Sequence, residues 1–131
     1  MTEDRQAYIS YRLDRAREAL DEATVLWNTA HYNAYVNRLY YACFYAVNAL
    51  LLAEKLKAST HSGVRHLFSR NFIKTHTFDR ELADIYFELF HYRHRADYED
   101  AFRIDPEIAG RWLERVKTFV NTIAQRISAS T

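Results

Sequence analysis

A short polar segment, residues 93–98, collects the side chains of this chain that are best suited to chemistry. It runs Arg-His-Arg-Ala-Asp-Tyr. The guanidinium of Arg93 can bind a phosphate or a carboxylate, and the imidazole of His94 can carry a proton near neutral pH. Asp97 stands one helical turn after Arg93, so the two side chains can pair on one face of a helix. This segment is therefore the first candidate for a functional site.

Arg93 stands where an apolar side chain is expected. Apolar residues recur at Leu82, Ile85 and Leu89, and the same helical spacing continues onto Arg93. A buried charge is costly unless it is paired and hydrogen-bonded. Two interpretations stay open: an ordinary ion pair between Arg93 and Asp97 with the arginine stem packed on the core, or a groove that remains polar.

Several neighbouring residues favour the groove. They are His91, His94 and Arg95 in the same turn, Tyr92 and Tyr98 beside them, and Asn37, Arg38, Tyr40 and Tyr41 on another predicted helix. Tyrosines can pack a ring while keeping a hydroxyl for hydrogen bonding, so some of the ten in this chain are expected at an interface or cleft.

The elements that position this segment are predicted to be helices. Two glycines and one proline leave little turn chemistry for a β fold. Apolar spacing predicts long helices over residues 3–30, 33–57, 78–98 and 106–127, and a short helix over 64–72. The second should be the most buried. Thr77 is the predicted N-cap of the third, and Asp105 and Pro106 begin the last. The predicted fold class is an all-α antiparallel up-and-down bundle, one domain spanning residues 1–131.

Composition narrows the function classes. The net charge of +1 over 131 residues excludes a protein that binds nucleic acid through overall charge, although a local patch such as the run 65–80 can face RNA or simply be solvated. Cys43 is the single cysteine, expected to be an inert packed thiol in a reducing cytoplasm. No apolar run reaches about 18 residues, so no membrane span is expected.

Metal and cofactor sites are not expected either. His91 and His94 are three apart, but no HExxH pattern accompanies them. Glycine-rich phosphate loops such as GxGxxG are also missing from the sequence. The prediction is a protein with no metal and no cofactor.

Three segments together resemble the small stand-alone HEPN domains of prokaryotes. They are residues 37–46 (Asn-Arg-Leu-Tyr-Tyr-Ala-Cys-Phe-Tyr-Ala), residues 60–63 (Thr-His-Ser-Gly) and residues 93–98, in an order that spans nearly the whole chain. The resemblance implies a bundle of four or five helices that dimerises, often with a minimal nucleotidyltransferase as partner or antitoxin. Many such domains are metal-independent ribonucleases whose two copies form one cleft across the dimer.

The family's ribonuclease motif is an Arg, a polar residue, three further residues and a His. By this resemblance Arg93 and His94 take the first two positions, while Tyr98 stands at the His position. A phenol with a pKa of about 10 is a poor base at neutral pH. His94 or His91 could carry the proton instead, although a neighbouring helical position is turned by about 100°.

Some relatives are regulated by nucleotide transfer onto a tyrosine near this motif. Tyr98 is the nearest phenol here, and the alternative is that it caps the groove through a hydrogen bond to Asp97 or to the backbone. Tyr98 is therefore a candidate for modification as well as for catalysis.

These observations lead to one prediction and two alternatives. The prediction is a dimer with a polar groove around Arg93 that binds RNA, a nucleotide or a nucleotidyltransferase partner in a toxin-antitoxin-like system. The alternatives are an active metal-independent endoribonuclease and a purely structural dimerisation module. The candidate catalytic residues are Arg93, His94 and Tyr98, and the candidate binding residues are Asp97, Arg95, Asn37 and Arg38.

Overall fold

The computed structural model describes residues 2–99 and 102–130, with the main chain but not the side chain of Asp97. In this part of the chain the long helices are α1 (Glu3–Asn28), α2 (Tyr32–Ala53), α4 (Arg80–Tyr98) and α6 (Trp112–Ala129). The short ones are α3 (His61–Phe68), continued by a π-helical turn (Ser69–Ile73), and α5 (Pro106–Ala109). The predicted all-α fold is confirmed.

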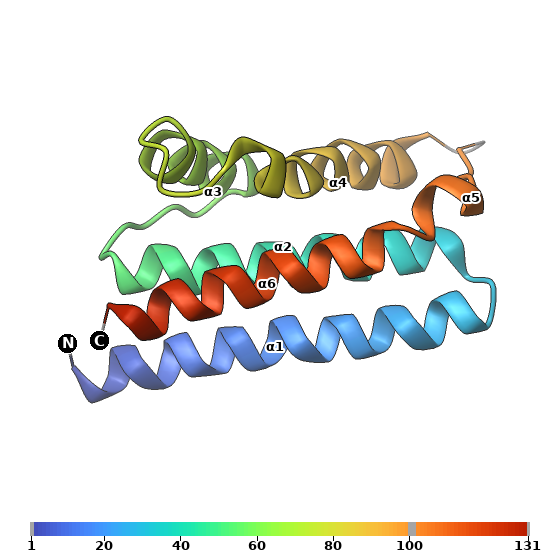
Figure 1. The fold of residues 1–131 in the computed structure, drawn as a ribbon. Helices are drawn as coiled ribbons and strands as arrows, with labels where there is room; N and C mark the ends of the chain where they lie inside the picture. Colours follow the sequence, from blue (N-terminus) through green and yellow to red (C-terminus); the bar gives the residue numbers. More distant parts are fainter. Residues whose placement is uncertain (1, 100–101, 131) are drawn as a thin grey trace.

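The four long helices alternate in direction along the bundle (Figure 1). α2 and α6 lie between α1 and α4, and α2 contacts α1, α3, α4, α5 and α6. Both chain ends lie at one end of the bundle, and the C-terminal end of α4 lies at the other (Figure 1). Because α2 is surrounded on several sides, its side chains are predominantly apolar or aromatic, as its sequence indicated.

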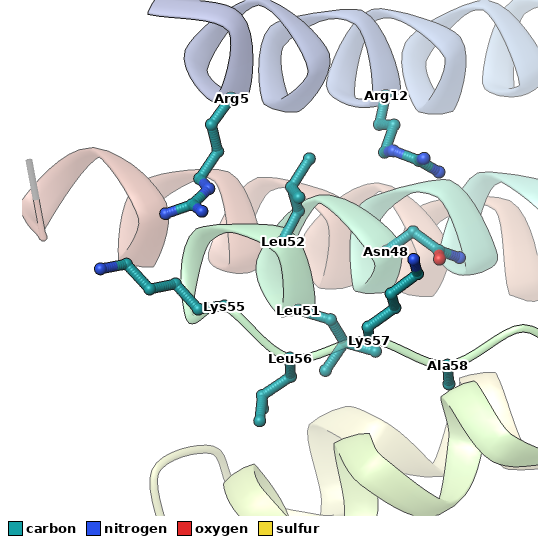
Figure 2. Close-up of a pocket in the computed structure, with 9 residues that line it drawn as sticks. All are labelled: Arg5, Arg12, Asn48, Leu51, Leu52, Lys55, Leu56, Lys57 and Ala58. Atoms are coloured by element: carbon teal, nitrogen blue, oxygen red, sulfur yellow. The ribbon is translucent and has the colours of Figure 1, made fainter. Parts of the chain in front are cut away.

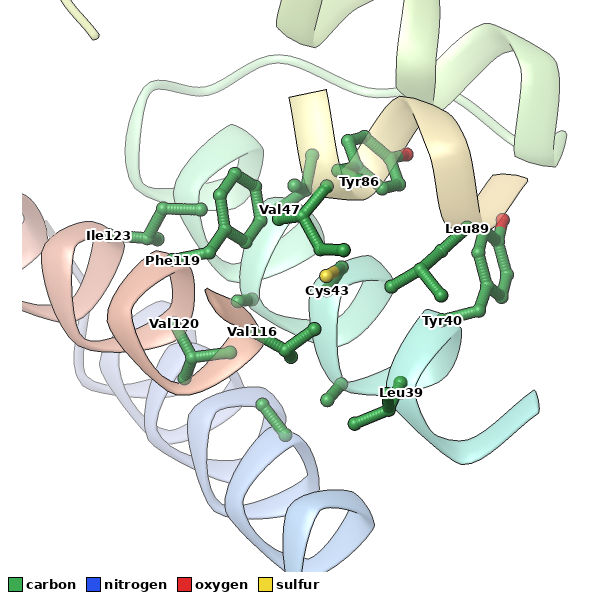
Figure 3. Packing of buried hydrophobic residues seen from close by; sticks show 14 of the residues in the cluster. Leu39, Tyr40, Cys43, Val47, Tyr86, Leu89, Val116, Phe119, Val120 and Ile123 are labelled. Atoms are coloured by element: carbon green, nitrogen blue, oxygen red, sulfur yellow. The ribbon is translucent and has the colours of Figure 1, made fainter. Parts of the chain in front are cut away.

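The core forms where α2, α4 and α6 meet. Figure 3 shows part of it, with side chains from α2 (Leu39, Tyr40, Cys43, Val47), α4 (Tyr86, Leu89) and α6 (Val116, Phe119, Val120, Ile123). Cys43 is fully buried in this cluster, and burial raises the pKa of its thiol. The thiolate that would be reactive is thus disfavoured, in agreement with the packed thiol expected from the sequence.

α1 is an amphipathic helix on the outside of the bundle. Its buried stripe is Ile9, Ala16, Ala19, Leu20 and Ala23. The exposed face carries charged residues, and one pair on it is Arg15 with Glu18 at 2.8 Å. Among the helices that the structure describes, none combines the length and the apolar character needed to cross a membrane.

The start of α4 differs from the prediction. Asp79, not Thr77, is the N-cap residue, and α4 begins at Arg80. The hydroxyl of Thr77 lies 3.0 Å from that of Thr75. The main-chain N–H of Phe78 donates to the carbonyl of Phe72 at 2.9 Å, which holds the buried Phe78 in a turn. Burial of this ring therefore takes precedence over the local capping preference of Thr77.

The predicted last helix is interrupted. The carboxylate of Asp105 accepts from the N–H of Glu107 at 3.0 Å, so the predicted start is confirmed, but α5 ends at Ala109. The hydroxyl of Tyr35 donates to the carbonyl of Ala109 at 2.8 Å. A Cβ atom on Gly110 would lie 3.0 Å from Cη2 of Trp27. The interruption thus lets the ring of Trp27 pack close to the backbone before α6 begins.

Candidate functional site

Three polar or aromatic side chains meet where α2, α3 and α4 come together. The hydroxyl of Tyr40, on α2, lies 2.6 Å from Nδ1 of His61 at the start of α3. The guanidinium carbon of Arg93, on α4, lies 4.9 Å from the centre of the Tyr40 ring. Tyr40 is fully buried, whereas His61 and Arg93 are half-buried. We call Tyr40, His61 and Arg93 the inner cluster.

The segment before α3 explains why His61 is held in this place. Oγ1 of Thr60 accepts from the N–H of Gly63 at 2.9 Å and so caps the helix. A Cβ atom on Gly63 would lie only 2.8 Å from Oγ1 of Thr60, so glycine leaves room for the cap. The cap starts α3 at His61, whose ring stacks on that of Phe44 with centres 4.4 Å apart.

Burial and charge set the protonation states in the inner cluster. Burial lowers the pKa of His61, and the positive charge of Arg93 lowers it further. Burial also raises the pKa of Tyr40, an effect that Arg93 partly offsets. At neutral pH the imidazole is therefore uncharged and the phenol protonated. The arrangement is an uncharged imidazole close to a cation, which can accept a proton while the cation holds an anion.

Arg65 adds a second cation at the edge of the inner cluster. Its guanidinium carbon lies 4.2 Å from the centre of the Phe90 ring, and that ring lies 6.1 Å from the ring of Tyr40. The other basic residues of the run 65–80 are exposed, namely His66, Arg70, Lys74, His76 and Arg80. Among the basic residues of this run, Arg65 is the one that is half-buried and in contact with a ring next to the inner cluster.

His94 and Tyr98 form a separate group on the outer side of α4. Their rings are in tilted contact with centres 4.7 Å apart, His94 is exposed and Tyr98 is 73% exposed. Five residues of an α-helix turn by about 140° beyond a full turn, so Arg93 and Tyr98 emerge on different sides of α4. We call His94 and Tyr98 the outer pair. Within one chain, the structure does not bring the outer pair together with Arg93.

Arg95 and Asp97 complete the polar segment. Nε of Arg95 forms an ion pair with Glu99 at 2.7 Å, and its guanidinium carbon lies 4.5 Å from the centre of the Phe102 ring. These contacts anchor the end of α4 to the chain that follows. The side chain of Asp97 lies outside what the structure describes, so its predicted pairing with Arg93 stays a prediction.

Asn37 and Arg38 are linked to the inner cluster through the ring of Tyr41. Arg38 pairs with Glu22 at 3.2 Å and donates to Oδ1 of Asn37 at 3.2 Å. Its guanidinium carbon also lies 5.0 Å from the centre of the Tyr41 ring, which lies 5.9 Å from the ring of His61. The charge of Arg38 is already offset by Glu22, so this residue is placed to support the cluster more than to bind an anion.

Sequence reasoning did not identify His61 or Tyr40 as site residues. His61 was considered only as part of the HEPN-like segment 60–63, and Tyr40 only as one of several residues that favour a polar groove. The cap formed by Thr60 and Gly63 is a signal that could have placed His61 at a helix start. The contact between His61 and Tyr40 joins two different helices, so the spacing of residues along the sequence does not reveal it. In the described ranges, no group of three or more His, Cys, Asp and Glu side chains is placed to hold a metal ion.

Comparison with known proteins gives a consistent result. A sequence model of the HEPN domain matches residues 9–127. A protein of Thermotoga maritima named "UPF0332 protein" is 38% identical over 124 residues, which cover 95% of this chain and 94% of that protein. A protein of Methanocaldococcus jannaschii named "Putative toxin MJ0142" is 37% identical over 109 residues, which cover 83% of this chain and 74% of that protein.

Proposed function

This chain belongs to the HEPN domain family, and from that premise we propose that it is a toxin-like protein that binds RNA at the inner cluster. The observation that carries the proposal is Arg93 over the ring of Tyr40, whose hydroxyl reaches His61. An arginine guanidinium matches the oxygens of a phosphate, and aromatic rings such as that of the half-buried Tyr41 can stack on a base.

We propose further that two copies act together. The outer pair does not converge with Arg93 in one chain, so a groove lined by the whole polar segment requires the α4 helices of two molecules. A dimer of this kind would place the exposed Tyr98 of each copy beside the inner cluster of the other. Analytical ultracentrifugation that finds only a monomer at micromolar concentration, with and without RNA, would contradict this part of the proposal.

The RNA-binding proposal is tested with a pair of variants on α4. Arg93→Met keeps most of the apolar stem and removes the charge, whereas Arg95→Met removes a charge that Glu99 already offsets. A charge-assisted hydrogen bond contributes about 1.5–3 kcal/mol, so Arg93→Met should weaken binding by tenfold or more. The measurement is fluorescence anisotropy with labelled single-stranded RNA.

Two results would contradict the proposal. One is the absence of RNA binding by the unaltered protein at low salt. The other is an equal loss of affinity in Arg93→Met and Arg95→Met, because it would mean that the loss comes from the lower net charge and not from the position of Arg93. Circular dichroism on both variants establishes that the helices persist, so a loss of binding in Arg93→Met reports on the site.

An endoribonuclease is the second candidate, and the uncharged His61 is the observation that favours it. His61 would take the proton of a ribose 2′-hydroxyl while Arg93 holds the neighbouring phosphate. The 2′-oxygen would attack phosphorus, the bond from phosphorus to the 5′-oxygen would break, and that oxygen would take a proton from water. RNA ending in 2′,3′-cyclic phosphate after incubation in EDTA would support this step, and its loss in His61→Gln would assign it. RNA left intact under those conditions would contradict it.

A nucleotidyltransferase partner is also proposed, on the exposure of Tyr98. Its phenol is 73% exposed at the end of α4, where an enzyme could reach it. In this step the phenol oxygen of Tyr98 would bond to the α-phosphorus of ATP, pyrophosphate would leave and the phenol proton would pass to solvent. The added phosphodiester would place negative charge beside the proposed groove and oppose RNA binding. Incubation with a co-encoded nucleotidyltransferase and ATP should give a mass increase that Tyr98→Phe removes and that Tyr8→Phe, at a tyrosine 61% exposed on α1, retains. A mass increase that persists in Tyr98→Phe would exclude this residue.

A further inference from the structure

We infer that a second phosphate-binding site lies between the start of α1 and the end of α2, and that it holds the RNA backbone beyond the inner cluster. A cavity of about 380 Å³ opens there (Figure 2). Arg5 and Arg12 extend into it from α1, and Lys57 extends toward Asn48 (Figure 2). The full lining is Arg5, Arg12, Asn48, Leu51, Leu52, Lys55, Leu56, Lys57 and Ala58. We call this cavity the basic pocket.

The positive charge of the basic pocket is not offset. Four cationic side chains line it, and no acidic side chain does. Six cations elsewhere in the bundle pair with carboxylates, such as Arg15 with Glu18, and within residues 2–99 and 102–130 none of the four pocket cations forms an ion pair. Nε of Arg12 is moreover buried without a hydrogen-bond partner among the described residues. Like charges gathered in one cavity repel one another, and a bound anion would remove that repulsion.

The backbone conformation of Lys55 also supports a functional role for the basic pocket. α2 ends in a motif in which the N–H of Leu56 donates to the carbonyl of Leu51 at 2.8 Å and that of Lys55 to Leu52 at 3.1 Å. Lys55 takes the left-handed conformation, with φ of 61°, at the position where glycine is usual. A lysine there is strained relative to glycine, and such strain gathers at functional sites. The charge of Lys55 is thus present at a structural cost.

The basic pocket adjoins the inner cluster along two paths. On α2, the side chain of Asn48, which lines the pocket, donates to the carbonyl of Phe44, whose ring stacks on His61. On the connecting segment, Ala58 lines the pocket and stands three residues before His61. Eight residues of α2 separate Tyr40 from Asn48, which is roughly 12 Å along the helix axis. One short strand of RNA can therefore reach both places.

The ligand class follows from this chemistry. Several cations with an amide donor and apolar walls suit the phosphates of a flexible polyanion. A free nucleotide offers the same phosphate chemistry, so the experiment has to separate the two sources. Because this inference rests on the proposed RNA binding, the experiment must also distinguish a failure of the basic pocket from a failure of RNA binding at the inner cluster.

The experiment compares a pocket variant with two matched controls. Lys55→Gly removes both the strain and the charge. Ala30 ends α1 in the same hydrogen-bonded motif, with φ of 59°, so Ala30→Gly relieves strain alone. Lys117→Ala removes one lysine of α6, outside the pocket. Affinity for a labelled single-stranded RNA of about ten nucleotides is measured from 0.05 to 0.3 M salt, a length that covers a single-strand site.

The expected result is specific to the pocket. Lys55→Gly should not lower Tm, should weaken binding roughly fourfold at 0.15 M salt, and should reduce the slope of log Kd against log salt by about 0.7, the value for one lost phosphate contact. Lys57→Ala should give the same loss of affinity. Ala30→Gly and Lys117→Ala should leave the slope unchanged. RNA binding that is unaffected by Lys55→Gly and Lys57→Ala would overturn the inference while leaving the inner cluster intact.

A second titration separates the sources and the proposals. Inorganic pyrophosphate should bind Lys55→Gly more weakly than the unaltered protein, and Lys117→Ala, outside the pocket, should bind it as the unaltered protein does. If pyrophosphate and ATP depend on Lys55 while RNA does not, the pocket serves a free phosphate compound and the RNA assignment is overturned. If neither pyrophosphate nor RNA depends on Lys55, the pocket is not a phosphate site.

Discussion

The inner cluster and the outer pair both draw on residues 93–98 of α4 and have little else in common. Arg93 is half-buried, with the ring of Tyr40 beneath its guanidinium. The rings of His94 and Tyr98 contact each other at a tilt and are exposed to solvent. The inner cluster takes its other members from α2 and α3, whereas the outer pair has no member outside α4. The inner cluster therefore depends on the tertiary fold, and the outer pair on a local turn of helix.

This difference shows how a short helical motif distributes its chemistry. Neighbouring positions on a helix are turned by about 100°, so a run of polar residues cannot all face one substrate. Here the cation faces inward and lies over a tyrosine ring from another helix. The imidazole of His94 and the phenol of Tyr98 are exposed to solvent. Three measurements test this difference between the inner cluster and the outer pair.

The largest expected effect contrasts the two tyrosines. Tyr40→Ala removes a fully buried ring that contacts Phe44, Tyr86 and Phe90, and should lower the free energy of unfolding by about 3–5 kcal/mol. Tyr98→Ala removes an exposed ring and should change it by less than about 0.5 kcal/mol. Urea unfolding followed by circular dichroism measures both. A cost for Tyr98→Ala close to that for Tyr40→Ala would mean that the outer pair is part of the folded core.

A smaller change in the free energy of unfolding is expected when one of two buried tyrosine hydroxyls is removed. Tyr40→Phe removes the hydroxyl that bonds Nδ1 of His61 and should cost about 1 kcal/mol. Tyr86 is also buried, but its hydroxyl has no hydrogen-bond partner among the described residues. Tyr86→Phe should therefore be neutral or slightly stabilising. Equal costs for the two changes would argue against a specific role for the bond to His61.

The smallest effect is a dependence on pH. The folded protein holds the pKa of His61 below its ordinary value of about 6.5, so between those two values the unfolded chain binds more protons than the folded one. The contribution of His61 to stability is then complete above about pH 6.5 and is lost as the pH falls toward the pKa of the folded state.

This dependence is isolated by His61→Phe, which keeps a ring against Phe44. Thermal unfolding at pH 7 and pH 5 should show a smaller fall in Tm on acidification for the variant than for the unaltered protein. Other histidines contribute equally to both and cancel. An identical or larger fall in the variant would contradict the lowered pKa.

Apolar periodicity was sufficient to predict the long helices, because apolar residues recur with the helical period in each of them, even in α2, which is buried on several sides. It misplaced their ends where tertiary contacts prevail. Phe78 is buried in a turn, which moves the start of α4 beyond Thr77. Trp27 packs on Gly110 between α5 and α6. The low helix propensity of Gly110 is a local signal for this interruption, but the contact with Trp27 is not visible in residues 106–127 alone.

The candidate site was predicted only in part. The place of Arg93 on an apolar stripe is a local property, and the structure agrees with it. Whether Arg93 acts on RNA stays a prediction, as does any role for His94 and Tyr98. His61 could not be assigned a role, because its partner Tyr40 is 21 residues away and on another helix. Contacts between helices are set by packing angles and not by spacing along one of them.

The position of the chain ends affects how this protein can be immobilised. Both ends lie at the same end of the bundle, away from the C-terminal turns of α4 (Figure 1). A sensor surface coupled to either end would leave the outer pair facing the bulk solution. Arg5, which lines the basic pocket, is close to the N-terminus, so N-terminal coupling would crowd the pocket. Coupling through the N-terminus would thus hinder access to the basic pocket while leaving the outer pair accessible.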